Sequence, residues 1–111
     1  MTRQDQTRLA DVLAAIEAID DHLTRGDLND GLVYDAVRVR LIEIGEAVKG
    51  VDPTLLATEP SVPWRAIARM RDHLAHRYFD TDHAVVADVV ENELGPLEVA
   101  VRALAERVED D

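Results

Sequence analysis

The chain contains no cysteine and few aromatic residues. The absence of cysteine excludes disulfides and thiolate metal ligands, and it is compatible with a reducing compartment. Only 4% of the residues are aromatic although 47% are hydrophobic, so the core must be built from aliphatic side chains, which favours packed helices. No hydrophobic run is long enough to span a bilayer, and the N-terminus lacks the apolar run of a signal peptide. We therefore expect a soluble, cytoplasmic protein with no membrane contact.

Positive charge is also scarce. Twelve Lys and Arg face 23 Asp and Glu, which gives a net charge of -11. Such a chain is repelled by polyanions, and this argues against broad non-specific binding to nucleic acid or anionic membranes. The exception is the segment 64–78, which carries four arginines and a single acid. One positive region therefore interrupts an acidic chain.

The length and the apolar spacing predict a single all-α domain over residues 1–111. Apolar side chains recur at steps of three and four over 2–25, 33–48 and again from Val85 to the C-terminus. Asn29 or Asp30 can cap the second of these helices, and a helix start at 61–64 predicts a further helix to about Tyr78. No segment alternates with the period of a strand. The expected architecture is an antiparallel bundle of four to five helices.

Three local signals refine this prediction. Gly45 lies within the second helix at a cost of about 1 kcal/mol relative to alanine, so we expect another backbone to pack closely against it. Residues 79–82 supply turn and capping residues between the third and fourth helices. Gly95 and Pro96 must break or kink the fourth helix.

The positive region ends in the stretch RDHLAHRY, residues 71–78. Four residues spaced four apart would lie on one ridge of the third helix, which begins before the stretch and continues into it. They are Arg65, Arg69, His73 and Arg77. Asp72 lies one turn before His76, where a carboxylate can hold the imidazole in one tautomer. Arg71 is five residues from His76, so the two are not stacked on one helix face, and a second subunit can be needed to bring them together.

These residue types match what RNA cleavage without a metal requires: a base for the 2′-OH proton, an acid for the leaving oxygen, and a cation for the charged transition state. His76 can serve as general acid or base, and Arg71 as a bidentate phosphate clamp. Tyr78 offers a stacking or hydrogen-bonding surface for a nucleotide. The composition of the stretch fits this chemistry, whereas its spacing alone does not establish it.

Two other interpretations remain open. The arginine ridge can be a solvated helix face paired with acids elsewhere, and His73 a surface residue. A zinc site is also conceivable, because His73 and His76 share a helix face, and its ligands would be Asp72, His73, His76 and His83. No HExxH helix or cysteine framework supports that site, so we expect no metal and no cofactor.

The stretch resembles a known family. Arg71, His76 and Tyr78 form the R-x4-H-x-Y signature of the HepT-like ribonucleases, the toxin branch of the HEPN superfamily. Residues 44–47, IGEA, and residues 62–67, VPWRAI, leading into Met70 and Arg71, resemble two further segments of that family. The three blocks occur in the same order and at similar spacing, and the likeness covers almost the whole chain.

The resemblance implies a helical homodimer in which Arg71 and His76 of both subunits face one cleft as the catalytic residues of an RNase. From their helical spacing, we expect Asp72, His73, Arg65, Arg69 and Arg77 to support the site or bind RNA. The resemblance further implies a nucleotidyltransferase antitoxin as partner, which silences the toxin by transferring AMP to Tyr78.

Two features depart from the family pattern. Asp72 stands where the family often has Asn, and its charge is expected to offset part of the Arg71 clamp. The strong negative charge of the chain also disfavours RNA. The competing hypothesis is therefore a catalytically silent helical module that uses the same residues to dock a nucleotidyltransferase or a nucleotide.

Overall fold

The computed structural model describes the backbone of residues 2–76 and 79–110, and the side chains of residues 2–76 and 83–107. Its elements in chain order are α1 (Arg3–Leu23), α2 (Gly31–Lys49), α3 (Pro53–Leu56), α4 (Trp64–Ala75), α5 (Phe79–Asp88), a π-helical turn η1 (Val89–Glu93) and α6 (Leu94–Asp110). No strand occurs within these described ranges, so the all-α prediction is confirmed.

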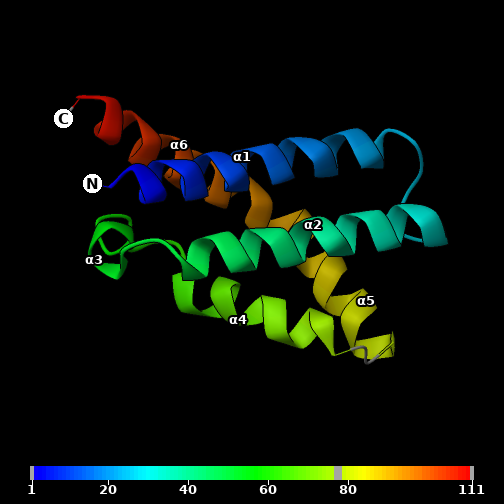
Figure 1. Ribbon diagram of the computed structural model, residues 1–111. Coiled ribbons are helices and arrows are strands. Elements are labelled where there is room, and N and C mark those ends of the chain that lie inside the picture. The colour runs from blue at the N-terminus through cyan, green and yellow to red at the C-terminus, as the bar shows by residue number, and fades with distance from the viewer. Residues whose placement is uncertain (1, 77–78, 111) are drawn as a thin grey trace.

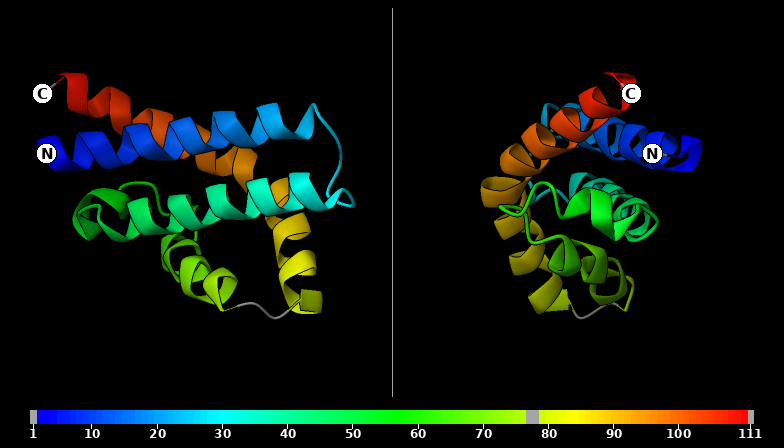
Figure 2. Two further views of the ribbon diagram at one scale, coloured as in Figure 1. Left: turned by 45° about the vertical axis from the view of Figure 1, so that its right-hand side comes forward. Right: turned by 90° about the vertical axis from the view of Figure 1, so that its left-hand side faces the viewer.

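The helices are arranged as antiparallel neighbours. α1 runs beside α2, α4 packs against the other side of α2, and α6 packs along α1 (Figure 1). The segment from α5 to α6 crosses the back of these helices, as the two rotated views show (Figure 2). α2 is therefore the central helix, in contact with α1, α4 and α5.

The core between these helices is aliphatic, as the composition predicts. The side chains that are almost fully inaccessible are Leu9, Val12, Ile19, Val37, Leu41, Ile44, Leu74, Val86, Val101 and Leu104. Every long helix contributes to this set, so the core is continuous through the bundle.

Capping side chains begin the first two helices at the predicted places. The Thr2 side chain accepts from the backbone N–H of Asp5, and the Asp5 carboxylate accepts from Thr2 in return, which forms a capping box. Asp5 is buried, and its other oxygen accepts from the backbone N–H of Asp52 at 3.1 Å. α2 begins at the Asp30 cap, one of the two predicted candidates.

The third predicted helix ends sooner than expected. We expected it to reach about Tyr78, but α4 ends at Ala75 with His76 as its C-cap. Arg38 of α2 donates a hydrogen bond to the carbonyl oxygen of Leu74, which satisfies one of the free carbonyls at this end. No local signal in the sequence marks that long-range cap. The prediction of a turn over 79–82 is also wrong, because α5 already begins at Phe79.

The predicted kink near Gly95 and Pro96 is confirmed, and a π-helical turn accompanies it. α5 and α6 run in different directions and are joined without a loop (Figure 2). The backbone N–H of Leu94 donates to the carbonyl of Val89, five residues earlier. Pro96 has no N–H to donate, so the wider turn just before it is where the helix changes direction.

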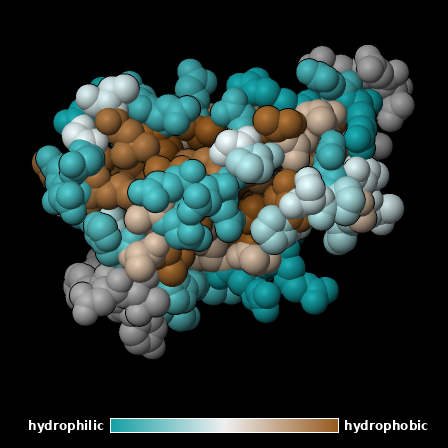
Figure 3. All heavy atoms as spheres, turned by 180° about the vertical axis from the view of Figure 1, so that it is seen from behind, coloured by the Kyte–Doolittle hydropathy of each residue, from teal (hydrophilic) through white to brown (hydrophobic). Residues whose placement is uncertain are grey.

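Apolar side chains also reach the surface. Leu32 and Val39 on α2 and Val99 on α6 are exposed. On the face opposite to that of Figure 1, apolar side chains gather between polar ones (Figure 3). Within the ranges given above, no helix is both long and apolar enough to cross a membrane.

Candidate active site

Arg71 lies on the side of α4 that faces α2. A Cβ atom added to Gly45 of α2 would lie only 2.8 Å from Cβ of Arg71 and 3.0 Å from the carbonyl oxygen of Ile67. The close backbone contact predicted for Gly45 is therefore confirmed, and the backbone it contacts is that of Ile67 and Arg71. The missing side chain at Gly45 lets α4 approach α2 at this point.

Two carboxylates hold the Arg71 guanidinium. Nε lies 3.0 Å from Oε2 of Glu46 on α2, and Nη1 lies 2.8 Å from Oδ1 of Asp72 on α4. The hydrogen bond with Asp72, and then the charges of Glu46 and Asp72, raise the pKa of Arg71 above its ordinary value. The guanidinium therefore stays charged, and the Arg71 side chain is 42% exposed.

Asp72 interacts with both predicted catalytic residues. The hydrogen bond from Arg71 lowers the pKa of Asp72 the most, burial opposes this by a smaller amount, and the electrostatic attraction of Arg71, Lys49 and His76 lowers the pKa further. The carboxylate is thus ionised at neutral pH. The expected offset of the Arg71 charge is present, because Asp72 pairs directly with the guanidinium.

His76 occupies the C-cap of α4. Its backbone, with φ -91° and ψ 2°, leaves the helical conformation, and its N–H bonds to the carbonyl of His73 at 3.4 Å. The side chain is exposed. Arg71 and His76 therefore occupy one exposed end of α4 without sharing a helical ridge, as their spacing predicts.

The residues of the predicted arginine ridge differ in their exposure to solvent. Arg65 and Arg69 are exposed on α4, whereas His73 is half-buried and lines a groove toward Val85 and Asp88 of α5. Arg77 and Tyr78, the last two residues of the predicted site, lie outside the described residues.

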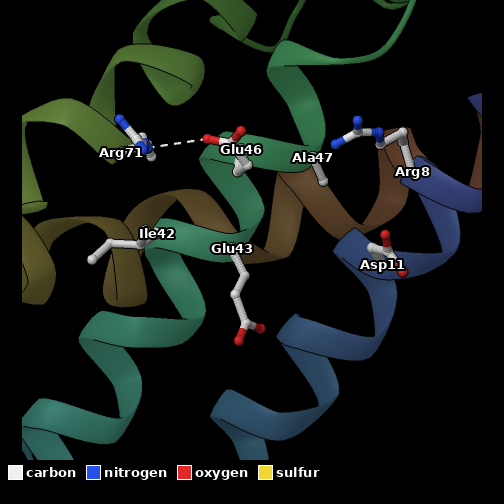
Figure 4. Close-up of a pocket in the computed structure, with 7 residues that line it drawn as sticks. All are labelled: Arg8, Asp11, Ile42, Glu43, Glu46, Ala47 and Arg71. Carbon is white, nitrogen blue, oxygen red and sulfur yellow. Dashed lines mark ion pairs between the residues drawn. The ribbon is translucent and has the colours of Figure 1, made fainter.

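A groove with a volume of about 490 Å³ runs from Arg71 across α2 to α1. Its lining residues are Arg8, Asp11, Ile42, Glu43, Glu46, Ala47 and Arg71, shown in Figure 4. The Glu46 side chain points to Arg71, while Glu43 points away from it (Figure 4). The sequence does not indicate this groove, because its lining residues come from three helices and share no local motif.

The four residues of the zinc alternative are not assembled. His83 on α5 stacks against Tyr34 with ring centroids 5.3 Å apart, and its Nε2 lies 3.2 Å from the carbonyl oxygen of Leu28. In the part of the chain that the structure describes, no three His, Cys, Asp or Glu residues are grouped so as to hold a metal ion.

The site lies within a segment that matches a known family. The sequence pattern described as "Ribonuclease HepT-like" matches residues 9–104, which is most of the chain. The chain belongs to this family. The resemblance drawn from the three sequence blocks is therefore confirmed, and the family is one of ribonucleases.

Individual relatives agree with the family match. A Thermococcus cleftensis protein named "Probable ribonuclease HepT" is 34% identical, over 87% of this chain and 92% of its own length. A Methanocaldococcus jannaschii protein whose name proposes an RNase is 39% identical, over 60% of this chain and 55% of its own length. With that second relative, the match therefore spans about half of the relative's length. No solved structure is significantly similar to the chain.

Proposed function

We propose that this protein is an endoribonuclease that cleaves RNA through Arg71 and His76 without a metal ion. The observation that carries the proposal is the charged, half-exposed Arg71 side chain, held by Glu46 and Asp72 on the helix that His76 caps, in a chain of this family. Relatives that carry ribonuclease names support the same reaction class.

The reaction follows from these groups. One histidine takes the proton of the 2′-OH, the 2′-oxygen bonds to phosphorus, and the bond from phosphorus to the 5′-oxygen breaks as a second acid delivers a proton to that oxygen. Arg71 compensates the additional negative charge on the phosphoryl oxygens in the transition state. The products are a 2′,3′-cyclic phosphate and a free 5′-OH.

The test compares cleavage of RNA by the parent, Arg71→Ala and His76→Ala, with a metal chelator present throughout. Each variant should lose at least about 100-fold in rate, a typical contribution of an acid–base or charge-stabilising group. Arg102→Ala is the control, because it removes an exposed arginine of α6 that does not line the Arg71 groove. If folded Arg71→Ala and His76→Ala cut as fast as Arg102→Ala, the proposal is wrong.

The active form is proposed to be a homodimer in which both copies supply Arg71 and His76 to one cleft. The single chain supports this, because Arg71 and His76 do not share a ridge of α4 and because Leu32 and Val39 leave apolar surface exposed on the neighbouring α2. Mixing inactive Arg71→Ala with inactive His76→Ala should restore part of the activity. No recovery in mixtures that exchange subunits would contradict the shared cleft.

The protein is further proposed to be the toxin of a toxin–antitoxin pair, whose nucleotidyltransferase partner transfers AMP to Tyr78. Tyr78 follows His76 closely in the chain, so a bound AMP would bring a bulky anion to the Arg71 clamp and block RNA. Intact-mass analysis after co-expression with the neighbouring nucleotidyltransferase should show added AMP on the parent and none on Tyr78→Phe. AMP found on another residue would overturn this assignment.

The alternative function is a catalytically silent module that docks a nucleotidyltransferase or a nucleotide. The ion pairs with Glu46 and Asp72 compensate part of the positive charge of Arg71. Weaker binding of a phosphate by Arg71 would favour this alternative. A parent protein that binds RNA or nucleotide but cuts nothing would support this alternative.

A further inference from the structure

Two consecutive residues of α2 contact the same arginine of α4. Gly45 allows the backbone of Arg71 to lie against α2, and Glu46, the next residue, holds the guanidinium at Nε. The contact with Gly45 fixes the base of the Arg71 side chain, and the contact with Glu46 fixes its guanidinium end. The pair therefore defines the position of Arg71 relative to another helix.

We propose that Glu46 is a positioning residue of the ribonuclease site, which orients the Arg71 guanidinium toward the scissile phosphate. The inference rests on the proposed function. A bidentate contact with phosphate requires the guanidinium plane to be fixed, and an arginine on a flexible stem has many other conformations. Glu46 restricts them before the substrate binds, which is the usual role of a supporting group around a catalytic residue.

Asp72 cannot replace Glu46 in this role. Asp72 and Arg71 are neighbours on α4, so their contact moves with α4 and does not fix the guanidinium against the rest of the groove. The contact with Glu46 crosses from α4 to α2 and ties the guanidinium to the wall of the groove (Figure 4).

A purely stabilising role does not explain the Glu46 contact. The side chains of Glu46 and Arg71 are 54% and 42% exposed, and ion pairs at such exposure contribute little to folding. The groove provides an internal comparison. Glu43, on the same helix and in the same groove, pairs with Arg40 at 3.2 Å rather than with Arg71.

Removing Glu46 should loosen the orientation of Arg71 without weakening the binding of the substrate. Without the carboxylate, Arg71 loses its anchor in the transition state, and kcat falls. The substrate phosphate also loses a competing anion, so KM stays constant or falls. A simultaneous decrease of kcat and KM is the signature of a group that orients a partner while opposing substrate binding.

The experiment compares Glu46→Gln with Glu43→Gln, which makes the same charge change in the same groove without touching Arg71. We expect kcat to fall about tenfold in Glu46→Gln, with KM equal or lower, and to stay within about twofold of the parent in Glu43→Gln. A second readout is the NMR signal of the Arg71 Nε–H group, assigned by its loss in Arg71→Lys. That signal should shift in Glu46→Gln and not in Glu43→Gln.

The outcomes separate the two proposals. A folded parent that cuts no RNA overturns the proposed function, and the inference with it. A parent that cuts RNA, together with equal effects of the two variants or with a kcat that rises in Glu46→Gln, overturns the positioning role of Glu46 alone.

Discussion

Replacing Gly45 by alanine tests the contact between α2 and Arg71 directly. The new Cβ would lie 2.8 Å from Cβ of Arg71, 3.0 Å from the carbonyl oxygen of Ile67 and 3.1 Å from the backbone nitrogen of Arg71. Carbon atoms in contact are normally about 3.5–4.0 Å apart. None of these three atoms is the end of a flexible side chain, so α4 has to move away from α2.

The two energetic effects of this substitution have opposite signs. Overpacking in a well-packed region costs about 1–3 kcal/mol. Alanine is better than glycine inside a helix by about 1 kcal/mol, which offsets part of that cost. Because the clashing atoms are rigid, we expect a net loss of about 1–2 kcal/mol in the free energy of unfolding, or about 4–8 °C in Tm for a domain of this size.

The assay is urea and thermal unfolding followed by circular dichroism, with Gly31→Ala as the matched control. Gly31 also lies in α2, but a Cβ added there would meet no atom within 4 Å other than those of its chain neighbours. Gly31→Ala should therefore leave stability unchanged or raise it by up to about 1 kcal/mol. If Gly45→Ala is as stable as Gly31→Ala, the close approach of α4 to α2 is refuted.

The same substitution should affect catalysis more than stability. Moving α4 displaces Arg71, and a shift of about 1 Å in a positioned group can lower a rate by about 100-fold. RNA cleavage by the folded fraction of Gly45→Ala should therefore fall by at least about tenfold, while Gly31→Ala should cut at the rate of the parent.

Two further predictions concern buried and paired carboxylates. Asp5→Ala removes the buried acceptor of the Thr2 and Asp52 backbone N–H groups, so the free energy of unfolding in urea should fall by about 1–3 kcal/mol. Asp11 is exposed on the same helix, and Asp11→Ala should change this free energy by less than about 0.5 kcal/mol. An equal effect of both substitutions would contradict the role of the Asp5 contacts. Asp72→Asn tests the pH dependence of stability. The pKa of Asp72 is lower in the folded state than its ordinary value of about 3.9, so the ionised carboxylate stabilises the folded state above that value. This contribution is lost as the pH falls through the lower folded-state pKa. The stability difference between parent and Asp72→Asn, measured by urea unfolding from pH 7 to pH 2.5, should thus be constant above about pH 5 and should shrink below about pH 4, and a difference that grows on acidification would contradict the pairing with Arg71.

The sequence predicted best what neighbouring residues determine. Helix starts at Thr2 and Asp30 depend on side chains that cap their own helix, and both were predicted. The cost of a glycine inside a helix is also local, so Gly45 could be recognised as a point of close packing. What packs there, the backbone of Ile67 and Arg71, could not be predicted from spacing because it belongs to a different helix.

The sequence predicted least where a distant residue decides the structure. The end of α4 at Ala75 has no glycine or proline to mark it, and the hydrogen bond that supports it comes from Arg38 of α2. In the same way, Arg71 could be recognised by its motif, whereas Glu46 was noticed only as part of a family segment. Its contact with Arg71 depends on how two helices lie side by side.

The π-helical turn η1 accommodates one extra residue in the segment from α5 to α6. The buried apolar positions of this segment include Val86, Val89, Leu94, Leu97, Val101 and Leu104. Their steps are three or four residues, except for the step of five between Val89 and Leu94, where the turn lies. Deleting a single residue there would leave a step of four, which an ordinary α-helix places on the same face, so the buried side chains would keep their direction without the π-helical turn. A deletion within 89–93 should therefore be tolerated better than a deletion in the middle of α6, which would rotate the apolar face by about 100°.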